Sequence, residues 1–215
     1  MKKNLFVGFV VFCMVFVSGS KVFPADIGIK AGMSVVNVTF SQDIPGIEFS
    51  SRTEFIVGAF ISINLFKILA VQPEVYYLNK GVNSTESDES AKYKFSYIEI
   101  PVLFKLKIPT TKNIKPSIFA GPYAAFNIKA REIETENGVT AETDLEDFTK
   151  KMDYGLVFGG CVEYKLGFGK LILDARYNLG LVNIMKYLRI LTSGVMDDDD
   201  YIKNKSFTIM IGFSF

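Results

Sequence analysis

The segment Leu171-Ile172-Leu173-Asp174-Ala175-Arg176-Tyr177-Asn178-Leu179 alternates two kinds of side chain along most of its length. Its odd-numbered positions are apolar or aromatic, whereas Asp174, Arg176 and Asn178 stand at even-numbered positions. Successive side chains of a β-strand point to opposite faces, so this alternation predicts a strand with one apolar face and one charged face. The same period of two recurs in seven further segments, which are residues 27–35, 55–63, 69–77, 98–106, 118–128, 154–164 and 207–215. The sequence therefore predicts an all-β fold with eight strands.

The connections between these segments alternate strictly in length. Short links lie near residues 65–67, 109–113 and 166–169, and longer polar stretches cover residues 39–52, 81–92, 131–149 and 183–203. In an up-and-down antiparallel sheet this order places every long connection at one end and every short turn at the other. An even strand number also lets the last strand pair with the first, which leaves no free edge. We therefore expect an eight-stranded antiparallel up-and-down β-barrel with short turns and four long loops.

The second face of each strand decides between a soluble barrel and a membrane barrel. In a soluble barrel the apolar face points inward and the charges face water; in a membrane barrel the apolar face meets lipid and the charges are enclosed and paired. The loop asymmetry favours a transmembrane barrel with periplasmic turns and extracellular loops, and a soluble periplasmic ligand-binding barrel is the alternative. The polar residues on the second faces are Lys30, Gln72, Glu74, Glu99, Lys105, Glu163, Asp174 and Arg176.

The N-terminal residues have the order of a secretory signal. Lys2 and Lys3 precede an apolar run at residues 5–17, and small residues follow at 18–20. This run is shorter than the ~20 apolar residues that a spanning helix needs, so we expect a signal peptide at residues 1–20, cleaved after residue 20 or 25. The predicted barrel domain covers residues 27–215. After cleavage Cys161 is the one remaining cysteine, so no internal disulfide is expected.

The composition excludes several classes of function. The 24 Lys and Arg against 23 Asp and Glu give a formal charge of +1, which provides no electrostatic reason to expect nucleic acid as a partner. The absence of histidine excludes Ser-His-Asp and Cys-His catalysis and histidine-ligated metal sites. We expect no enzyme activity and no cofactor.

Several short motifs resemble a known family. They are Gln72-Pro73-Glu74, Tyr97-Ile98-Glu99-Ile100-Pro101, Phe119-Ala120-Gly121-Pro122-Tyr123, Tyr154-Gly155-Leu156-Val157-Phe158-Gly159 and Asp174-Ala175-Arg176-Tyr177. With the aromatic C-terminus, they resemble the PorT-like, porin-like outer-membrane β-barrels, and the resemblance extends over about residues 27–215. It implies an outer-membrane location in a Gram-negative bacterium, contact with outer-membrane lipid, and a role for Phe215 as the signal read by the barrel-assembly machinery after export. It implies no activity, and no role in secretion carries over to individual residues.

The enclosed charges are the main candidate site. Eight strands leave an interior just wide enough for side chains, so a satisfied lumen network is expected, with a proton path or a narrow channel for ions or very small solutes as the alternative. Pairing Glu163 with Ile172 in a hairpin places Arg176 opposite Gly159, which leaves room for the guanidinium. An acid and base pair of Glu74 and Glu99 is disfavoured because it lies inside a filled wall. The predicted network comprises Lys30, Glu74, Glu99, Lys105, Glu163, Asp174 and Arg176.

Two features of the long loops suggest other chemistry. The run Asp197, Asp198, Asp199 and Asp200 is a weak candidate for a divalent cation, but it lacks the spacing of an EF-hand loop and is more typical of a solvated acidic loop. Thr143 and Glu146 form a capping-box pattern that predicts a short helix at residues 147–152. The long loops are also where an unknown protein or glycan partner is expected to bind.

Overall fold

A single antiparallel sheet of ten strands makes up the computed structural model, which describes residues 24–40, 48–86, 89–110, 113–136, 139–144, 149–183 and 201–215. Among these residues, no helix is long and apolar enough to cross a membrane. The strands are β1 (Ala25–Phe40), β2 (Glu48–Ser50), β3 (Arg52–Asn64), β4 (Leu69–Glu86), β5 (Glu89–Lys107), β6 (Ile114–Glu136), β7 (Val139–Asp144), β8 (Met152–Leu166), β9 (Gly169–Gly180) and β10 (Ile202–Ser214).

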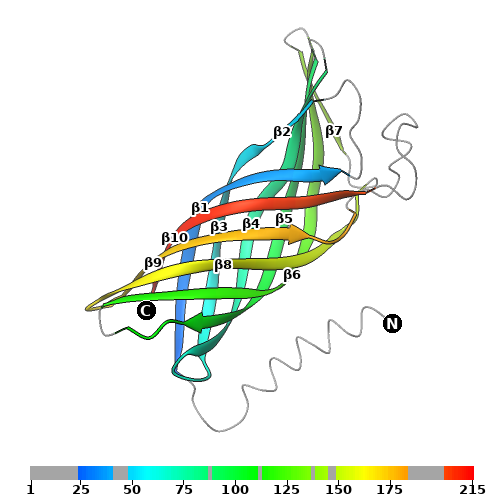
Figure 1. Ribbon diagram of the computed structural model, residues 1–215. Helices are drawn as coiled ribbons and strands as arrows, with labels where there is room; N and C mark the ends of the chain where they lie inside the picture. Colours follow the sequence, from blue (N-terminus) through cyan, green and yellow to red (C-terminus); the bar gives the residue numbers. More distant parts are fainter. Residues whose placement is uncertain are drawn as a thin grey trace.

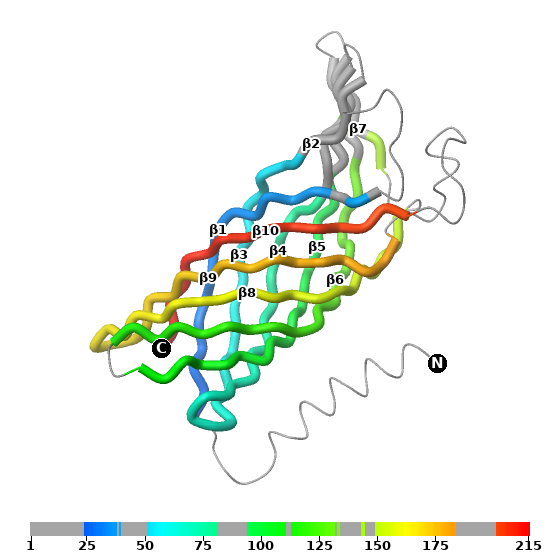
Figure 2. The backbone as a smooth tube through the Cα atoms, in the orientation of Figure 1, coloured from blue at the N-terminus to red at the C-terminus, as the bar shows by residue number. Residues whose placement is uncertain are grey.

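Eight of these strands close into a barrel. The pairing runs from β1 through β3, β4, β5, β6, β8 and β9 to β10, and β10 returns to β1 over a register from Gly28 opposite Ser214 to Phe40 opposite Ile202. Every pairing is antiparallel, so the predicted eight-stranded up-and-down barrel is confirmed (Figure 1). The tube trace shows the tilted strands wrapping around one common axis (Figure 2).

The outer surface of the barrel carries an apolar band. Along β1, Ile29 is 65% exposed whereas its neighbour Lys30 is 2% exposed, and the other strands alternate in the same way. The apolar runs extend over nine to eleven residues, which matches the roughly 9–11 residues that a tilted strand needs to cross a bilayer. The apolar side chains therefore face lipid, and the soluble alternative is wrong. The runs are residues 27–35, 55–63, 69–77, 98–106, 118–128, 154–164, 171–179 and 207–215.

The two ends of the barrel differ. At the end that we call the turn end, β3 joins β4 through residues 65–68 and β8 joins β9 through Gly167 and Phe168, and the C-terminus lies at the same end (Figure 1). The opposite end, which we call the loop end, holds the longer connections. Two of the predicted loops are mostly strand: β4 continues to Glu86 and β5 resumes at Glu89, while β6 continues to Glu136 and pairs with β7.

The extended parts of β4 and β6 pair with two short strands that the sequence does not predict. β2 pairs with β4 at Glu48–Ser50, and β7 pairs with β6 from Arg131 opposite Asp144 to Glu136 opposite Val139. The predicted helix at residues 147–152 is wrong in its described part, because Thr143 and Asp144 end β7 and Met152 begins β8. Residues 145–148 lie outside the described residues. The capping-box pattern here is a coincidence of composition, since its first residue belongs to a strand.

An arginine introduced on the outer surface tests whether the apolar band faces lipid. Ile211 lies at the middle of the run 207–215 and is 63% exposed, whereas Leu179 lies at the loop-end limit of its run. We expect Ile211→Arg to lower the free energy of unfolding by about 2–4 kcal/mol and Leu179→Arg by about 0–1 kcal/mol, because the cost of a charge facing lipid depends on depth. Urea unfolding in lipid vesicles measures both values. Equal costs for the two variants would contradict the assignment.

Candidate functional site

The lumen is filled with charged side chains that solvent does not reach. Strand alternation turns the polar face of each strand inward, and four cations and five carboxylates of the described residues are less than one-tenth exposed. Burial of an ionised group is costly unless it is paired, so the pairing of these groups determines what the site can do. The nine residues are Lys30, Glu74, Lys80, Glu99, Lys105, Asp153, Glu163, Asp174 and Arg176.

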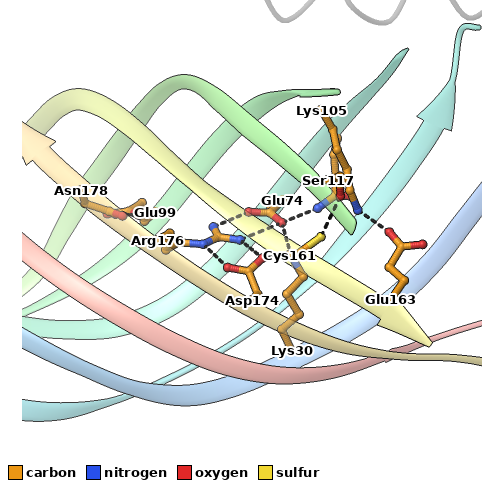
Figure 3. Close-up of polar contacts among 11 residues, drawn as sticks. Lys30, Glu74, Glu99, Lys105, Ser117, Cys161, Glu163, Asp174, Arg176 and Asn178 are labelled. Carbon is orange, nitrogen blue, oxygen red and sulfur yellow. Dashed lines mark hydrogen bonds and ion pairs between the residues drawn. The ribbon is translucent and has the colours of Figure 1, made fainter. Parts of the chain in front are cut away.

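Four of these residues form a balanced central cluster (Figure 3). Lys30 Nζ on β1 lies 2.8 Å from Glu74 Oε1 on β4 and 2.7 Å from Asp174 Oδ2 on β9. Arg176 donates to both carboxylates, with Nη1 2.6 Å from Glu74 Oε2 and Nη2 2.7 Å from Asp174 Oδ2. Each carboxylate therefore meets two cations, and the cluster connects β1 and β9 to β4 across the interior.

Aromatic rings complete the central level. The Arg176 guanidinium carbon lies 5.1 Å from the centre of the Phe119 ring and 5.3 Å from that of Tyr76, and Lys30 Nζ lies 4.8 Å from that of Phe60. Cations over ring faces gain additional electrostatic stabilisation where water is excluded. The predicted pairing of Glu163 with Ile172 and of Gly159 with Arg176 is confirmed. A Cβ at Gly159 would lie 2.9 Å from Phe119 Cζ, so part of the space that this glycine leaves is taken by the Phe119 ring.

A second cluster lies nearer the turn end. Lys105 on β5 bonds Glu163 on β8, and its Nζ lies 3.5 Å from Gln72 Oε1 on β4. Gln72 Nε2 donates to Glu74 Oε1 at 2.7 Å, which connects this cluster to the central one. Cys161 is buried and free, with its Sγ 3.2 Å from Ser117 Oγ. Lys105 and Glu163 therefore form a balanced pair rather than part of the central cluster.

A third cluster occupies the loop-end half of the lumen and contains two residues that the predicted network omits, Lys80 and Asp153. Lys80 Nζ lies 2.8 Å from Glu99 Oε2 and 3.4 Å from Asp153 Oδ2. Asn178 Nδ2 donates to Glu99 Oε1 at 2.7 Å. Glu99 is separate from the central cluster because neither Lys80 nor Asn178 belongs to that cluster. Both omitted residues lie just beyond the apolar runs of their strands. Extending the inward sequence 72, 74, 76, 78 by one more step would have found Lys80.

The remaining predicted residues do not join these clusters. Phe215 is 77% exposed at the turn end, and its ring lies 5.0 Å from that of Phe213. Residues 197–200, the weak cation candidate, lie outside the described residues. In the described part of the chain, no group of three or more Cys, Asp or Glu side chains is arranged to hold a metal ion. Both oxygens of Glu74 accept hydrogen bonds from cationic side chains, which does not suit a role in acid and base catalysis.

Comparisons with known proteins give one matching family and several similar structures. The family model "Outer membrane protein beta-barrel domain" matches residues 23–186. OprG of Pseudomonas aeruginosa has a similar structure, with a TM-score of 0.55, 12% identity, and coverage of 90% of this chain and 97% of that chain. Neisserial surface protein A, with a TM-score of 0.48, is 14% identical and covers 89% of this chain and 97% of its own. Ail of Yersinia pestis, with a TM-score of 0.45, is 11% identical and covers 89% and 99%.

These likenesses differ in what they establish. The OprG structure supports the fold of an outer-membrane β-barrel and, at this identity, nothing finer. The comparison with curated proteins gives no match. The narrower resemblance to PorT-like proteins stays a prediction.

The central cluster can be tested by removing one member. We expect Arg176→Met to lower the free energy of unfolding by about 3–5 kcal/mol, because it leaves two buried carboxylates facing Lys30 alone. As a control, Lys170→Met removes a partly exposed pair with Asp26 and should cost about 0–1 kcal/mol. Urea unfolding measures both.

A fourfold variant separates pairing from packing. Replacing Lys30, Glu74, Asp174 and Arg176 together by Met or Leu removes every charge of the cluster, so it should cost less than Arg176→Met alone. If the free energy of unfolding instead decreases further with each replaced residue, these ion pairs do not act as one unit.

Proposed function

The chain belongs to the outer membrane protein beta-barrel domain family, and from this membership we propose that it is a non-enzymatic outer-membrane barrel with a closed lumen that acts through the β-structure at its loop end. The observation that carries the proposal is the central cluster, in which Lys30, Glu74, Asp174 and Arg176 are all at most 3% exposed. The burial of these charges supports a closed lumen, and a wide aqueous pore needs about 16 strands.

The length of three strands supports the proposal that the protein acts at its loop end. β4, β5 and β6 have 18, 19 and 23 residues, whereas their lipid-facing runs have nine, nine and eleven residues. Most of the remaining residues of each strand lie beyond the apolar band at the loop end, where β2 and β7 extend the same sheet (Figure 1). We propose that this sheet, with the long connections, faces the outside of the cell and presents a surface to a protein or glycan partner.

The opposite end fits assembly and export. We propose that the turn end faces the periplasm, that residues 1–20 are a signal peptide removed during export, and that Phe215 is read by the barrel-assembly machinery. Phe215 is accessible for such reading because its ring points away from the barrel interior and is exposed.

A narrow channel for ions or very small solutes is the second candidate function. Polar side chains continue along the lumen from Lys105 and Glu163 through Gln72 to the central cluster, and then to Asn178, Glu99 and Lys80. Conduction along this path would require the ion pairs of the central cluster to open. Enzyme activity receives no support from the described site.

Planar-bilayer recordings distinguish the two candidates. A closed lumen predicts no stable single-channel steps from the purified protein, because the central ion pairs block the path. Stable steps that disappear in Glu99→Leu or Arg176→Leu would favour the narrow ion path instead. A variant with an outward substitution, Ile211→Val, serves as the control for protein insertion.

Protease treatment of intact cells tests the proposed orientation. We expect cleavage to be confined to the connections at the loop end, and the turns at residues 65–68 and 167–168 to be protected until the outer membrane is opened. Mass spectrometry of the fragments identifies the sites. Cleavage at either turn in intact cells would show that the turn end faces the outside of the cell, which contradicts the proposed orientation.

A further inference from the structure

The buried charges of the lumen do not balance at every level. The central cluster pairs two cations with two carboxylates, and Lys105 pairs with Glu163. Among the described residues, the loop-end cluster contains one buried cation, Lys80, and two buried carboxylates, those of Glu99 and Asp153. The nearby pair of Arg52 and Glu54 is neutral in itself. The excess negative charge of the described lumen therefore lies in its loop-end half.

The same region contains buried oxygen atoms without hydrogen-bond partners. Within the described part of the chain, these atoms include Asp153 Oδ1, Asn178 Oδ1, Asn204 Oδ1 and Ser206 Oγ. Their residues are at most 3% exposed, so bulk water does not satisfy them. Buried polar atoms are almost always paired, and four unpaired ones in one region indicate that something with positive charge or with donors belongs among them.

Strand pairing places these oxygen-bearing residues on neighbouring positions of one wall. Asn178 on β9 is opposite Ser206 on β10, and Asn204 precedes Ser206 by two residues on the same face. Asn204 Nδ2 lies 3.0 Å from Asp153 Oδ2. Gly180, two residues after Asn178 on the same face, adds no side chain, and a Cβ there would first meet backbone atoms of Asn204.

We propose that this wall binds one monovalent metal cation of the sodium class, held by oxygen atoms of Asp153, Asn178, Asn204 and Ser206. Carboxylate, amide and hydroxyl oxygens are the ligands that hard cations prefer. One positive charge compensates the one excess carboxylate, whereas a divalent cation would overcompensate it. The Lys80 ammonium lies closer to Glu99, at 2.8 Å, than to Asp153, at 3.4 Å, which leaves Asp153 as the anionic ligand.

The test measures stability against cation type. Urea unfolding of the purified chain in non-ionic detergent is followed from about 10 to about 300 mM sodium chloride, with N-methylglucamine chloride making up a constant chloride concentration. Once sodium exceeds its dissociation constant, we expect the equilibrium constant for unfolding to fall about tenfold for each tenfold rise in sodium. N-methylglucamine, which is too large to enter, should give no such effect.

Two matched variants locate the effect. Asp153→Asn removes the excess charge and should abolish the dependence on sodium, and Ser206→Ala should shift the dependence to higher sodium concentration. Asp174→Asn makes the same chemical change in the balanced central cluster. It should lower stability in both salts and keep the dependence on sodium.

Several results would overturn the proposal. Equal stabilisation by N-methylglucamine would indicate a general effect of ionic strength, and stability that follows pH but not sodium would indicate a proton in place of the metal ion. Stability that follows neither would leave only water among these oxygens. Loss of the sodium dependence in Asp174→Asn but not in Asp153→Asn would place the site elsewhere.

Discussion

The enclosure of paired charges inside an apolar cylinder is the constraint on which the rest of this structure depends. Lys30, Glu74, Asp174 and Arg176 come from three strands, and each needs the others because neither lipid nor water is available to solvate it. A slip of one residue along any strand would turn its charges toward lipid and its apolar side chains into the lumen. The ion pairs therefore help to determine register as well as stability.

This arrangement inverts that of a soluble barrel. Many large apolar side chains lie outside in the apolar band, and the interior holds charges interleaved with rings such as Tyr76 and Phe119. The four charged side chains of the central level are at most 3% exposed, and on this basis we propose that specific recognition takes place at the ends. Of the two ends, the loop end has the longer strands and the additional sheet formed by β2 and β7.

The sequence predicts the part of the fold that a period of two can encode. Where an apolar residue alternated with a polar one, as in residues 171–179, the strand, its lipid-facing side and the Glu163–Ile172 register are all correct. The extensions of β4, β5 and β6 were predicted as loops because both of their faces are polar. Their strands are held by backbone pairing, which leaves no hydrophobic pattern in the sequence.

The sequence predicts which charged residues lie in the lumen better than it predicts which of them pair with one another. The alternation of side chains along each strand shows which of them point into the lumen. The partner of each charge depends on the stagger of the strands around the closed barrel, which local sequence does not encode. Glu99 was therefore grouped with the central charges, although it bonds Asn178 and pairs with Lys80. Asp153 and Lys80 were missed because they lie outside the apolar runs. The most direct test of the enclosed charges is spin-label accessibility along residues 171–179, with single cysteines introduced in a Cys161→Ser background in lipid vesicles. The account predicts that labels at odd positions collide with oxygen dissolved in the bilayer and that labels at even positions do not; the reverse pattern would contradict it.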